Sequence, residues 1–439
     1  MNGKSNEKSK LFLVVIMGLA LFASMFGAGN LIFPPFLGQD TGTGWHIGFI
    51  GFFIMDVGLA ACAIFSGVFN ARGDVDGIVG KLGNIPGKIM VTLVILCIGP
   101  GLVIPRTAAT TYEMGISTLV PELPLWLFGL IFFTIVFALS IRPTKVVDIV
   151  GNYLTPILLL VMIILIILGV VRPMGEITDI NEVIAFKSGI LNGYQTMDGL
   201  GGILMTMMLV TATTGYGFSD KKEIMKMIGG ADIIASVLLG LVYLGLTYLG
   251  ATTTSINHMI GLEQAPLLIA ITNKLLGGYG VIALSVIVLF ACLTTAICLT
   301  SVAGNYFSEL SGGKIKYEWI VIVVVVFSYA ISNAGLSTII SVAAPILSML
   351  YPPMIVLVVL AYFDRVFKNR HVAMLSAYVA FATAALEVVA MEMEALAFVH
   401  KLPLADYGVA WIIPAFIAAL IGLMWKDHGW EDFISGGAL

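Results

Sequence analysis

The chain has 439 residues, of which 59% are hydrophobic and 11% charged, and its formal net charge is −4. With a mean hydropathy of +1.03, this composition excludes a soluble globular protein and is typical of a chain with many membrane spans. No basic patch with interleaved aromatic residues occurs, so we expect no nucleic-acid partner. No GxxxxGK[ST] phosphate-binding motif occurs either, which argues against a nucleotide-driven pump and leaves an ion or substrate gradient as the energy source.

Hydrophobic runs and turn signals predict an all-α membrane protein with twelve transmembrane helices and no separate soluble domain. Most lysines and arginines fall on loops of one side, which places both termini in the cytoplasm of a multi-pass cell-membrane protein. A moderately apolar piece of the external loop at 253–278 is expected to be a short interfacial helix or part of a gate. The predicted spans are 11–37, 45–70, 88–118, 124–141, 147–171, 184–216, 229–252, 279–307, 319–335, 338–363, 371–398 and 407–425.

The first span contains the run MFGAGNLIFPPF at 25–36, which is a poor helix interior because of its glycines, asparagine and Pro-Pro pair. Within lipid, backbone groups freed by a break must be satisfied by protein, water or a ligand. A break at this depth therefore indicates a substrate and ion site, as in secondary transporters. The alternative interpretation is a plain kink.

Charged side chains also fall within the second and third predicted spans. Arg106 and Glu113 lie two helical turns apart on one face, so they either pair with each other or with groups on neighbouring helices. Asp56 in the second span has no evident partner in the sequence. An ionisable group at membrane depth costs about 2.5–3.5 kcal/mol on insertion scales, so each of the three requires a partner or a function.

The sixth span contains NGYQTMDGLGG at 192–202, where Asp198 precedes a glycine-rich run. This run predicts either a second break or a flexible continuous helix. The place of this span in the chain favours the break. Spans one and six each begin a group of five, and because five is an odd number the two groups lie inverted relative to each other across the membrane. In such an inverted repeat, the first helix of each group is expected to be broken. Asp198 is expected either to cap a half-helix or to bind an amine or an ion.

The eighth span supplies hydroxyl groups in ACLTTAICLTS at 291–301. An alkali ion binds neutral oxygen ligands of this kind, although threonines in membrane helices also bond back to a carbonyl one turn earlier. Half-helix N-termini at the two breaks present N–H groups that suit a carboxylate.

Four motifs resemble the bacterial branched-chain amino acid carriers of system II, the leucine, isoleucine and valine cation symporters. They are GAGNLIFPP at 27–35, IPRTA at 104–108 preceded by Gly99-Pro100, TMD at 196–198 and LTTAI at 293–297. The resemblance covers nearly the whole chain. It implies a single transporter domain of the amino acid–polyamine–organocation superfamily, with repeats at about 11–171 and 184–363 and two additional helices at about 371–425.

The resemblance also implies specific site residues. A sodium ion would be bound by carbonyls of Ala23 and Phe26 and by a helix-eight stretch, Ala291, Thr294 and Thr295. The substrate carboxylate would meet the backbone at the first break, with the rest of the substrate close to the second. The implied substrate-binding residues are Gly27, Ala28, Gly29, Asn30, Tyr112, Met197, Asp198 and Gly199.

From these observations we predict a carrier, and not an enzyme, that imports branched-chain amino acids with sodium by alternating access. Its expected partners are the substrate, sodium or a proton, and the lipid bilayer, with no cofactor besides the coupling ion and no obligatory protein partner. The alternative is a proton-coupled carrier of another small amino acid or amine, with Asp198 or Glu113 carrying the proton. The histidines are scattered at span ends and loops, which argues against a membrane-embedded enzyme.

Overall fold

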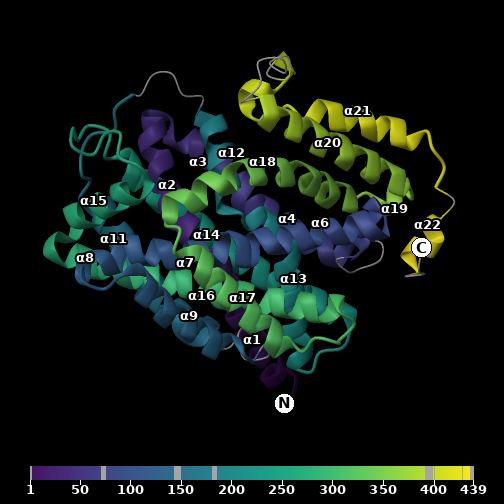
Figure 1. Cartoon of the computed structure of the whole chain (residues 1–439), viewed down its shortest axis with the longest axis horizontal. Helices are drawn as coiled ribbons and strands as arrows, with labels where there is room; N and C mark the ends of the chain where they lie inside the picture. Colours follow the sequence, from purple (N-terminus) through teal and green to yellow (C-terminus); the bar gives the residue numbers. More distant parts are fainter. Residues whose placement is uncertain are drawn as a thin grey trace.

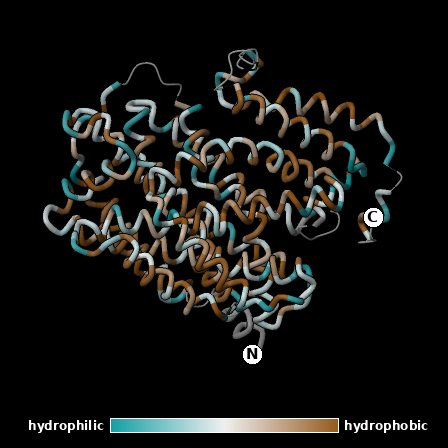
Figure 2. Tube along the Cα trace, in the orientation of Figure 1, coloured by the Kyte–Doolittle hydropathy of each residue, from teal (hydrophilic) through white to brown (hydrophobic). Residues whose placement is uncertain are grey.

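The computed structural model describes residues 2–70, 76–142, 150–179, 185–390, 399, 401–427 and 429–435, and these form helices and turns without a strand. Figure 1 shows the helices crossing as one bundle, with the N-terminus at one edge. Hydrophobic residues run along most helices, while hydrophilic ones gather toward loops and helix ends (Figure 2). This distribution is that of an all-helical membrane protein, because the helix surfaces face lipid instead of water.

Ten of the twelve predicted spans correspond to the following helices. They are α1 (Asn2–Met25) with α2 (Ala28–Thr41); α3 (Trp45–Phe53), η2 (Ile54–Gly58) and α4 (Leu59–Phe69); α6 (Asn84–Leu96), η4 (Cys97–Gly101), α7 (Val103–Thr111) and η5 (Tyr112–Ile116); α9 (Leu125–Ser140); η6 (Val150–Leu154) with α11 (Thr155–Val171); α12 (Ala185–Thr196) with α13 (Asp198–Gly215); α14 (Lys221–Ala251); α16 (Gly280–Leu310); α17 (Tyr317–Ser332); and α18 (Leu336–Ala361).

The remaining two correspond to α20 (Arg370–Ala390) and α21 (Ile412–Leu423), and the end of the predicted span at 371–398 lies outside the described residues. Among the described residues, seven helices are long and apolar enough to cross a membrane, and the bent pair α12–α13 adds an eighth. Four further apolar helices are shorter. The total of twelve spans stays a prediction.

The two broken spans, the first and the sixth, pack in matching ways: the first packs on the seventh span and the sixth packs on the second. The two halves of the first span, α1 and α2, both lie along α14, whereas α12 packs on α3 and α13 packs on α4. The contact between α2 and α14 is a backbone contact: a Cβ at Gly250 would lie 1.8 Å from Pro35 O, and one at Gly38 would lie 1.9 Å from Thr247 O. Only glycine permits helices to approach this closely.

The Pro-Pro pair does not break the helix, which corrects the expectation that the whole run at 25–36 interrupts the first span. Pro34 and Pro35 are buried inside α2, and the interruption is confined to Phe26 and Gly27. Proline removes the donor to a carbonyl one turn earlier, but here that turn is enclosed by α14 and by other helices. Membrane helices tolerate proline where neighbouring helices satisfy the freed groups.

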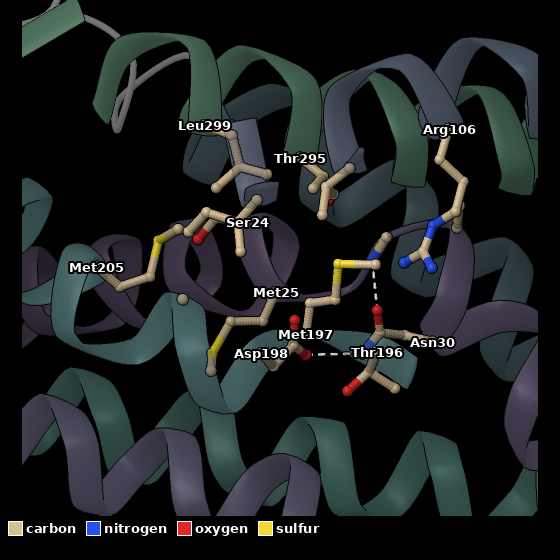
Figure 3. A pocket seen from close by; sticks show the side chains of 15 residues that line it. Ser24, Met25, Asn30, Arg106, Thr196, Met197, Asp198, Met205, Thr295 and Leu299 are labelled. Atoms are coloured by element: carbon tan, nitrogen blue, oxygen red, sulfur yellow. Dashed lines mark hydrogen bonds between the residues drawn. The ribbon is translucent and has the colours of Figure 1, made fainter. Parts of the chain in front are cut away.

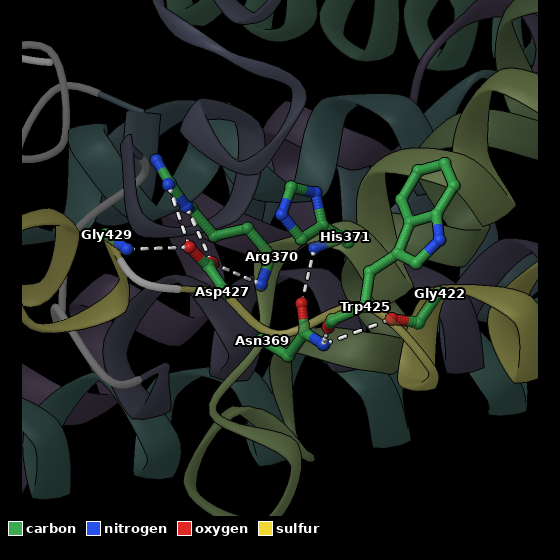
Figure 4. Close-up of polar contacts among 7 residues, drawn as sticks. All are labelled: Asn369, Arg370, His371, Gly422, Trp425, Asp427 and Gly429. Carbon is green, nitrogen blue, oxygen red and sulfur yellow. Dashed lines mark hydrogen bonds and ion pairs between the residues drawn. The ribbon is translucent and has the colours of Figure 1, made fainter.

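Three helices, α15 (Gln264–Leu276), α20 and α21, lie outside the packed centre of the bundle. The external piece predicted as an interfacial helix or gate forms α15, which packs on α2 and α16. α20 and α21 pair with each other at the periphery and reach the bundle through α18 (Figure 1). After α21 the chain returns to α20, where Asp427 accepts hydrogen bonds from the Arg370 side chain at 2.8 and 2.9 Å (Figure 4).

Candidate functional site

The first break separates α1 from α2 at Phe26 and Gly27. The Gly27 N–H lies 2.9 Å from Met25 O and 3.1 Å from Asn30 Oδ1, so Asn30 caps the first turn of its own helix (Figure 3). A Cβ at Gly27 would lie 3.0 Å from Thr295 Oγ1. The missing side chain therefore lets the break approach α16.

The second break is at Met197, one residue before the predicted Asp198. Met197 has φ 73°, a left-handed conformation that costs a non-glycine residue about 1–2 kcal/mol. It bends α12 against α13 by 42°. Asp198 is the first residue of α13, where the positive end of the helix dipole favours a negative charge.

One side chain connects the two breaks. Asn30 Nδ2 donates to Asp198 Oδ2 at 2.7 Å (Figure 3). The same nitrogen donates to the Tyr243 hydroxyl at 2.6 Å. Asn30 is 1% exposed and Tyr243 is fully buried. The amide of Asn30 therefore holds together the N-termini of α2 and α13 and the middle of α14.

Asp56, which had no evident partner in the sequence, lies beside this network. Its Oδ1 is 2.8 Å from Thr196 Oγ1 at the end of α12, and its carboxyl lies within hydrogen-bonding reach of Asp198. Asp56 is fully buried, and its Oδ2 has no hydrogen-bond partner among the described residues. Two carboxyl groups thus meet in the interior next to the second break.

Arg106 and Glu113 do not pair with each other. The Arg106 guanidinium donates to Gln195 O at 3.1 Å, at the carboxyl end of α12, and its Nη2 lies 2.9 Å from the position of a Cβ at Gly29. Glu113 Oε1 instead accepts from Leu336 N at 2.9 Å and caps α18. Of the two alternatives left by the sequence, contact with neighbouring helices is the observed one, and Arg106 forms no ion pair among the described residues.

Oxygen atoms from α1 and α16 meet at the predicted ion site. Thr294 Oγ1 donates at 2.9 Å to Ala23 O and lies 2.9 Å from Ala291 O, while Thr295 Oγ1 lies 3.3 Å from Ala23 O. Phe26 is buried at the break and its ring stacks on Phe22, with centroids 5.2 Å apart. The structure thus brings Ala23, Ala291, Thr294 and Thr295 together, with Phe26 three residues beyond Ala23.

A cavity of about 20 Å³ lies between the two breaks, which is space for one or two water-sized groups and not for an amino acid (Figure 3). Of the predicted substrate-binding residues, five line it, and Met25, Met205 and Arg106 line it as well. The five are Gly27, Ala28, Asn30, Met197 and Asp198.

Three predicted substrate-binding residues are not among the cavity-lining residues. The Tyr112 hydroxyl donates to Leu123 O at 2.9 Å, and its ring centroid lies 5.9 Å from that of Phe128. Gly29 contacts Arg106, and a Cβ at Gly199 would meet Leu59 at 2.6 Å. Tyr243 was missed by sequence reasoning, because a tyrosine inside an apolar span carries no signal of its own.

Comparison with known proteins identifies relatives along almost the whole chain. Residues 10–428 match the family described as branched-chain amino acid transport protein. The branched-chain amino acid permease BraB of Bacillus subtilis is 36% identical, over 93% of this chain and 94% of its own. The branched-chain amino acid permease BrnQ of Escherichia coli K12 is 31% identical, over 94% of this chain and 95% of its own. These relatives are transporters and not enzymes.

Solved structures share the fold at low sequence identity. A Na⁺-coupled sialic acid symporter has a TM-score of 0.62 at 13% identity, covering 94% of this chain and 89% of its own. A nucleobase-cation-symport-1 family transporter has a TM-score of 0.53 at 15% identity, covering 96% of each chain. The fold is therefore that of helical membrane transporters.

Proposed function

Because the chain belongs to the branched-chain amino acid transport protein family, we propose that it is a sodium-coupled importer of leucine, isoleucine and valine. The observation that carries the proposal is the meeting of two broken helices at a buried cavity flanked by an oxygen cluster. The protein works in the cell membrane with both termini in the cytoplasm. It needs no cofactor apart from the coupling ion, and no obligatory protein partner.

The site suits a zwitterion with an apolar side chain. The N-terminus of α2, at Ala28 and Gly29, offers N–H groups to the substrate carboxylate, and Arg106 adds a positive charge nearby. Asp198 offers a negative charge to the ammonium group. Met25, Met197 and Met205 line the same cavity and supply adaptable apolar surface for a branched side chain.

The proposed sodium site is the oxygen cluster between α1 and α16, with ligands from Ala23, Phe26, Ala291, Thr294 and Thr295. Its carbonyls and hydroxyls are the hard, neutral oxygen ligands that suit an alkali ion. With an ion bound, the threonine protons turn away and their oxygens face the cation.

Alternating access follows from a proposed inverted repeat of residues 11–171 and 184–363, with two additional helices after it. The packing of α1 and α2 on α14, mirrored by α12 and α13 on α3 and α4, supports this repeat. The cavity of about 20 Å³ is too small for the substrate, so binding requires the helices to separate. In the proposed motion, α1–α4 and α12–α14 rock against α6–α9, α16 and α17. An ion that bridges α1 and α16 would then favour one of the two states.

The test is uptake of labelled isoleucine into proteoliposomes that contain the purified full-length chain, with an inward sodium gradient or with choline in place of sodium. We expect saturable uptake that requires sodium and is competed by leucine and valine but not by lysine. Uptake that persists in choline and follows an inward pH gradient would contradict sodium coupling. Competition by lysine would contradict the substrate class.

The second candidate is a proton-coupled carrier of another small amino acid or amine. The fully buried carboxyl group of Asp56 and the half-buried one of Asp198 favour it, because carboxyl groups inside a membrane domain commonly relay protons. The choline arm of the same experiment, run with and without a pH gradient, separates this candidate from the first.

A further inference from the structure

The Asp56–Asp198 carboxyl pair has more acceptor atoms than the described donors satisfy. Asp198 Oδ2 accepts from Asn30, and Asp56 Oδ1 lies 2.8 Å from the Thr196 hydroxyl. Asp56 Oδ2 is buried without a partner, although the Asp198 carboxyl lies within hydrogen-bonding reach of Asp56. Two ionised carboxylates cannot donate to each other, so this contact is favourable only when a proton lies between them.

We propose that Asp56 and Asp198 bind one shared proton, so that the pair carries a single negative charge. This inference rests on the proposed function, because it assigns that charge to the ammonium group of the amino acid substrate. The site is made by two elements far apart in the chain, the helical segment η2 and the first turn of α13.

The charges around the pair fit this assignment. The groups that face it are Asn30 from α2, Arg106 from α7, Thr196 from α12, Tyr243 from α14 and Tyr351 from α18. Arg106 is the one cation among them. A singly protonated pair balances Arg106 and leaves a neutral site for a zwitterion, whereas two carboxylates would leave an uncompensated buried charge.

A proton and an asparagine amide can play the same role between these carboxyl groups. Asp56→Asn places an N–H donor where the proton would lie and leaves Asp198 ionised. Asp198→Asn supplies the same donor to Asp56 but removes the negative charge from the cavity. If the proton is shared, both variants should remove the protonated carboxyl group. Only Asp198→Asn should lower uptake strongly, because it also removes the negative charge from the cavity.

The first test is infrared spectroscopy of the purified full-length protein at neutral pH, in the region of the carboxylic acid C=O stretch. Each of Asp56→Asn and Asp198→Asn should remove the same band, because either change removes the shared proton. The matched control is Asp232→Asn, another buried carboxyl, on α14, which should leave that band in place. A band that survives Asp198→Asn would show that Asp56 alone holds the proton. A wild-type spectrum without such a band would overturn the proposal as well.

The second test is isoleucine uptake at equal internal and external pH. Wild-type uptake should fall at alkaline pH as the shared proton is lost, and Asp56→Asn should abolish this alkaline loss while lowering uptake at neutral pH by less than about threefold. Asp198→Asn should lower uptake by about tenfold or more at every pH, as expected for a lost charged partner. Asp232→Asn should keep the wild-type pH profile. An alkaline loss that persists in Asp56→Asn would overturn the proposal.

The two tests separate this inference from the proposed function. Absence of isoleucine uptake in the wild type would contradict the substrate assignment, whereas the infrared comparison requires no transport and would still decide whether the pair holds a proton.

Discussion

Thr294 Oγ1 donates to Ala23 O at 2.9 Å and so joins the middle of α16 to the last turn of α1. The two residues are separated by 271 positions in the sequence, and both are fully buried. Because α1 and α16 belong to the two groups of helices that we propose to rock against each other, this contact lies across the moving boundary. An ion that replaces the hydrogen bond would strengthen the same connection.

We therefore expect Thr294→Ala and Thr295→Ala each to raise the sodium concentration for half-maximal isoleucine uptake by about tenfold, as for the loss of one oxygen partner of a charged group. The double variant should lose sodium-dependent uptake. Thr134→Ala is the matched control, because the Thr134 hydroxyl bonds back to Leu130 O at 2.7 Å on an exposed face of α9. Unchanged sodium dependence in the double variant would exclude this cluster as the coupling site.

The sequence predicted the two breaks because local backbone chemistry decides where a helix can be interrupted. Gly27 and the glycines after Asp198 carry that information themselves. The exact residues of the two breaks were predicted less accurately. At the second break Met197, and not a glycine, takes the left-handed conformation, and at the first break Pro34 stays helical. Both departures depend on neighbouring helices, whose packing is not encoded locally.

The partners of Asp56 could not be predicted for a similar reason. Thr196 is 140 positions away, and the two residues meet only because α12 packs on η2, the helical segment that contains Asp56. Tyr112 shows the opposite case: the family resemblance implied that it binds substrate, whereas its hydroxyl donates to Leu123 O. A motif can indicate which helix lines a site, whereas the direction of a side chain depends on tertiary structure.

Asn30→Ala should lower transport strongly while reducing the stability of the fold only modestly. The change removes an N-terminal cap, which costs about 1 kcal/mol. It also removes the donor to Asp198 and Tyr243 and leaves buried acceptors without a partner. We expect isoleucine uptake to fall by at least about tenfold, because the two breaks are no longer held together.

The measurement is uptake in proteoliposomes with matched protein content, together with the thermal unfolding midpoint in detergent. Asn333→Ala serves as control, since the Asn333 amide bonds to Tyr329 O on an exposed turn. Uptake close to that of the wild type in Asn30→Ala would refute a linking role for this side chain.

Gly250→Ala should destabilise the fold without touching the cavity. A Cβ at this position would lie 1.8 Å from Pro35 O, so α14 would have to move away from α2. Overpacking of this kind typically costs about 1–3 kcal/mol. The thermal unfolding midpoint in detergent should fall, whereas Gly215→Ala, where no atom lies within 4 Å of the new Cβ, should leave it unchanged or raise it. Equal midpoints for the two variants would contradict the close backbone contact.

Docking of the C-terminal segment should depend on pH through Asp427. Burial raises the pKa of Asp427, but hydrogen bonds from the Arg370 side chain and backbone and from Gly429 N–H outweigh it and lower the pKa from 3.8 to about 2. Arg370 also lies over the Phe433 ring, 5.6 Å from its centroid, and so connects Asp427 to α22 (Trp430–Ile434). Since the docked state has the lower pKa, its stabilisation is complete above pH 3.8 and is lost as the pH falls toward 2.

Amide hydrogen exchange over residues 429–435 measures this docking directly. At pH 6, Asp427→Asn should exchange faster than the wild type, because Arg370 loses its charged partner. The difference should shrink between pH 4 and about 2, where the wild-type carboxyl becomes protonated and resembles the variant. Asp432→Asn, on α22 itself but outside the Arg370 contact, should follow the wild type throughout. A difference between wild type and Asp427→Asn that stays constant down to pH 2 would show that charge at Asp427 does not hold α22 in place.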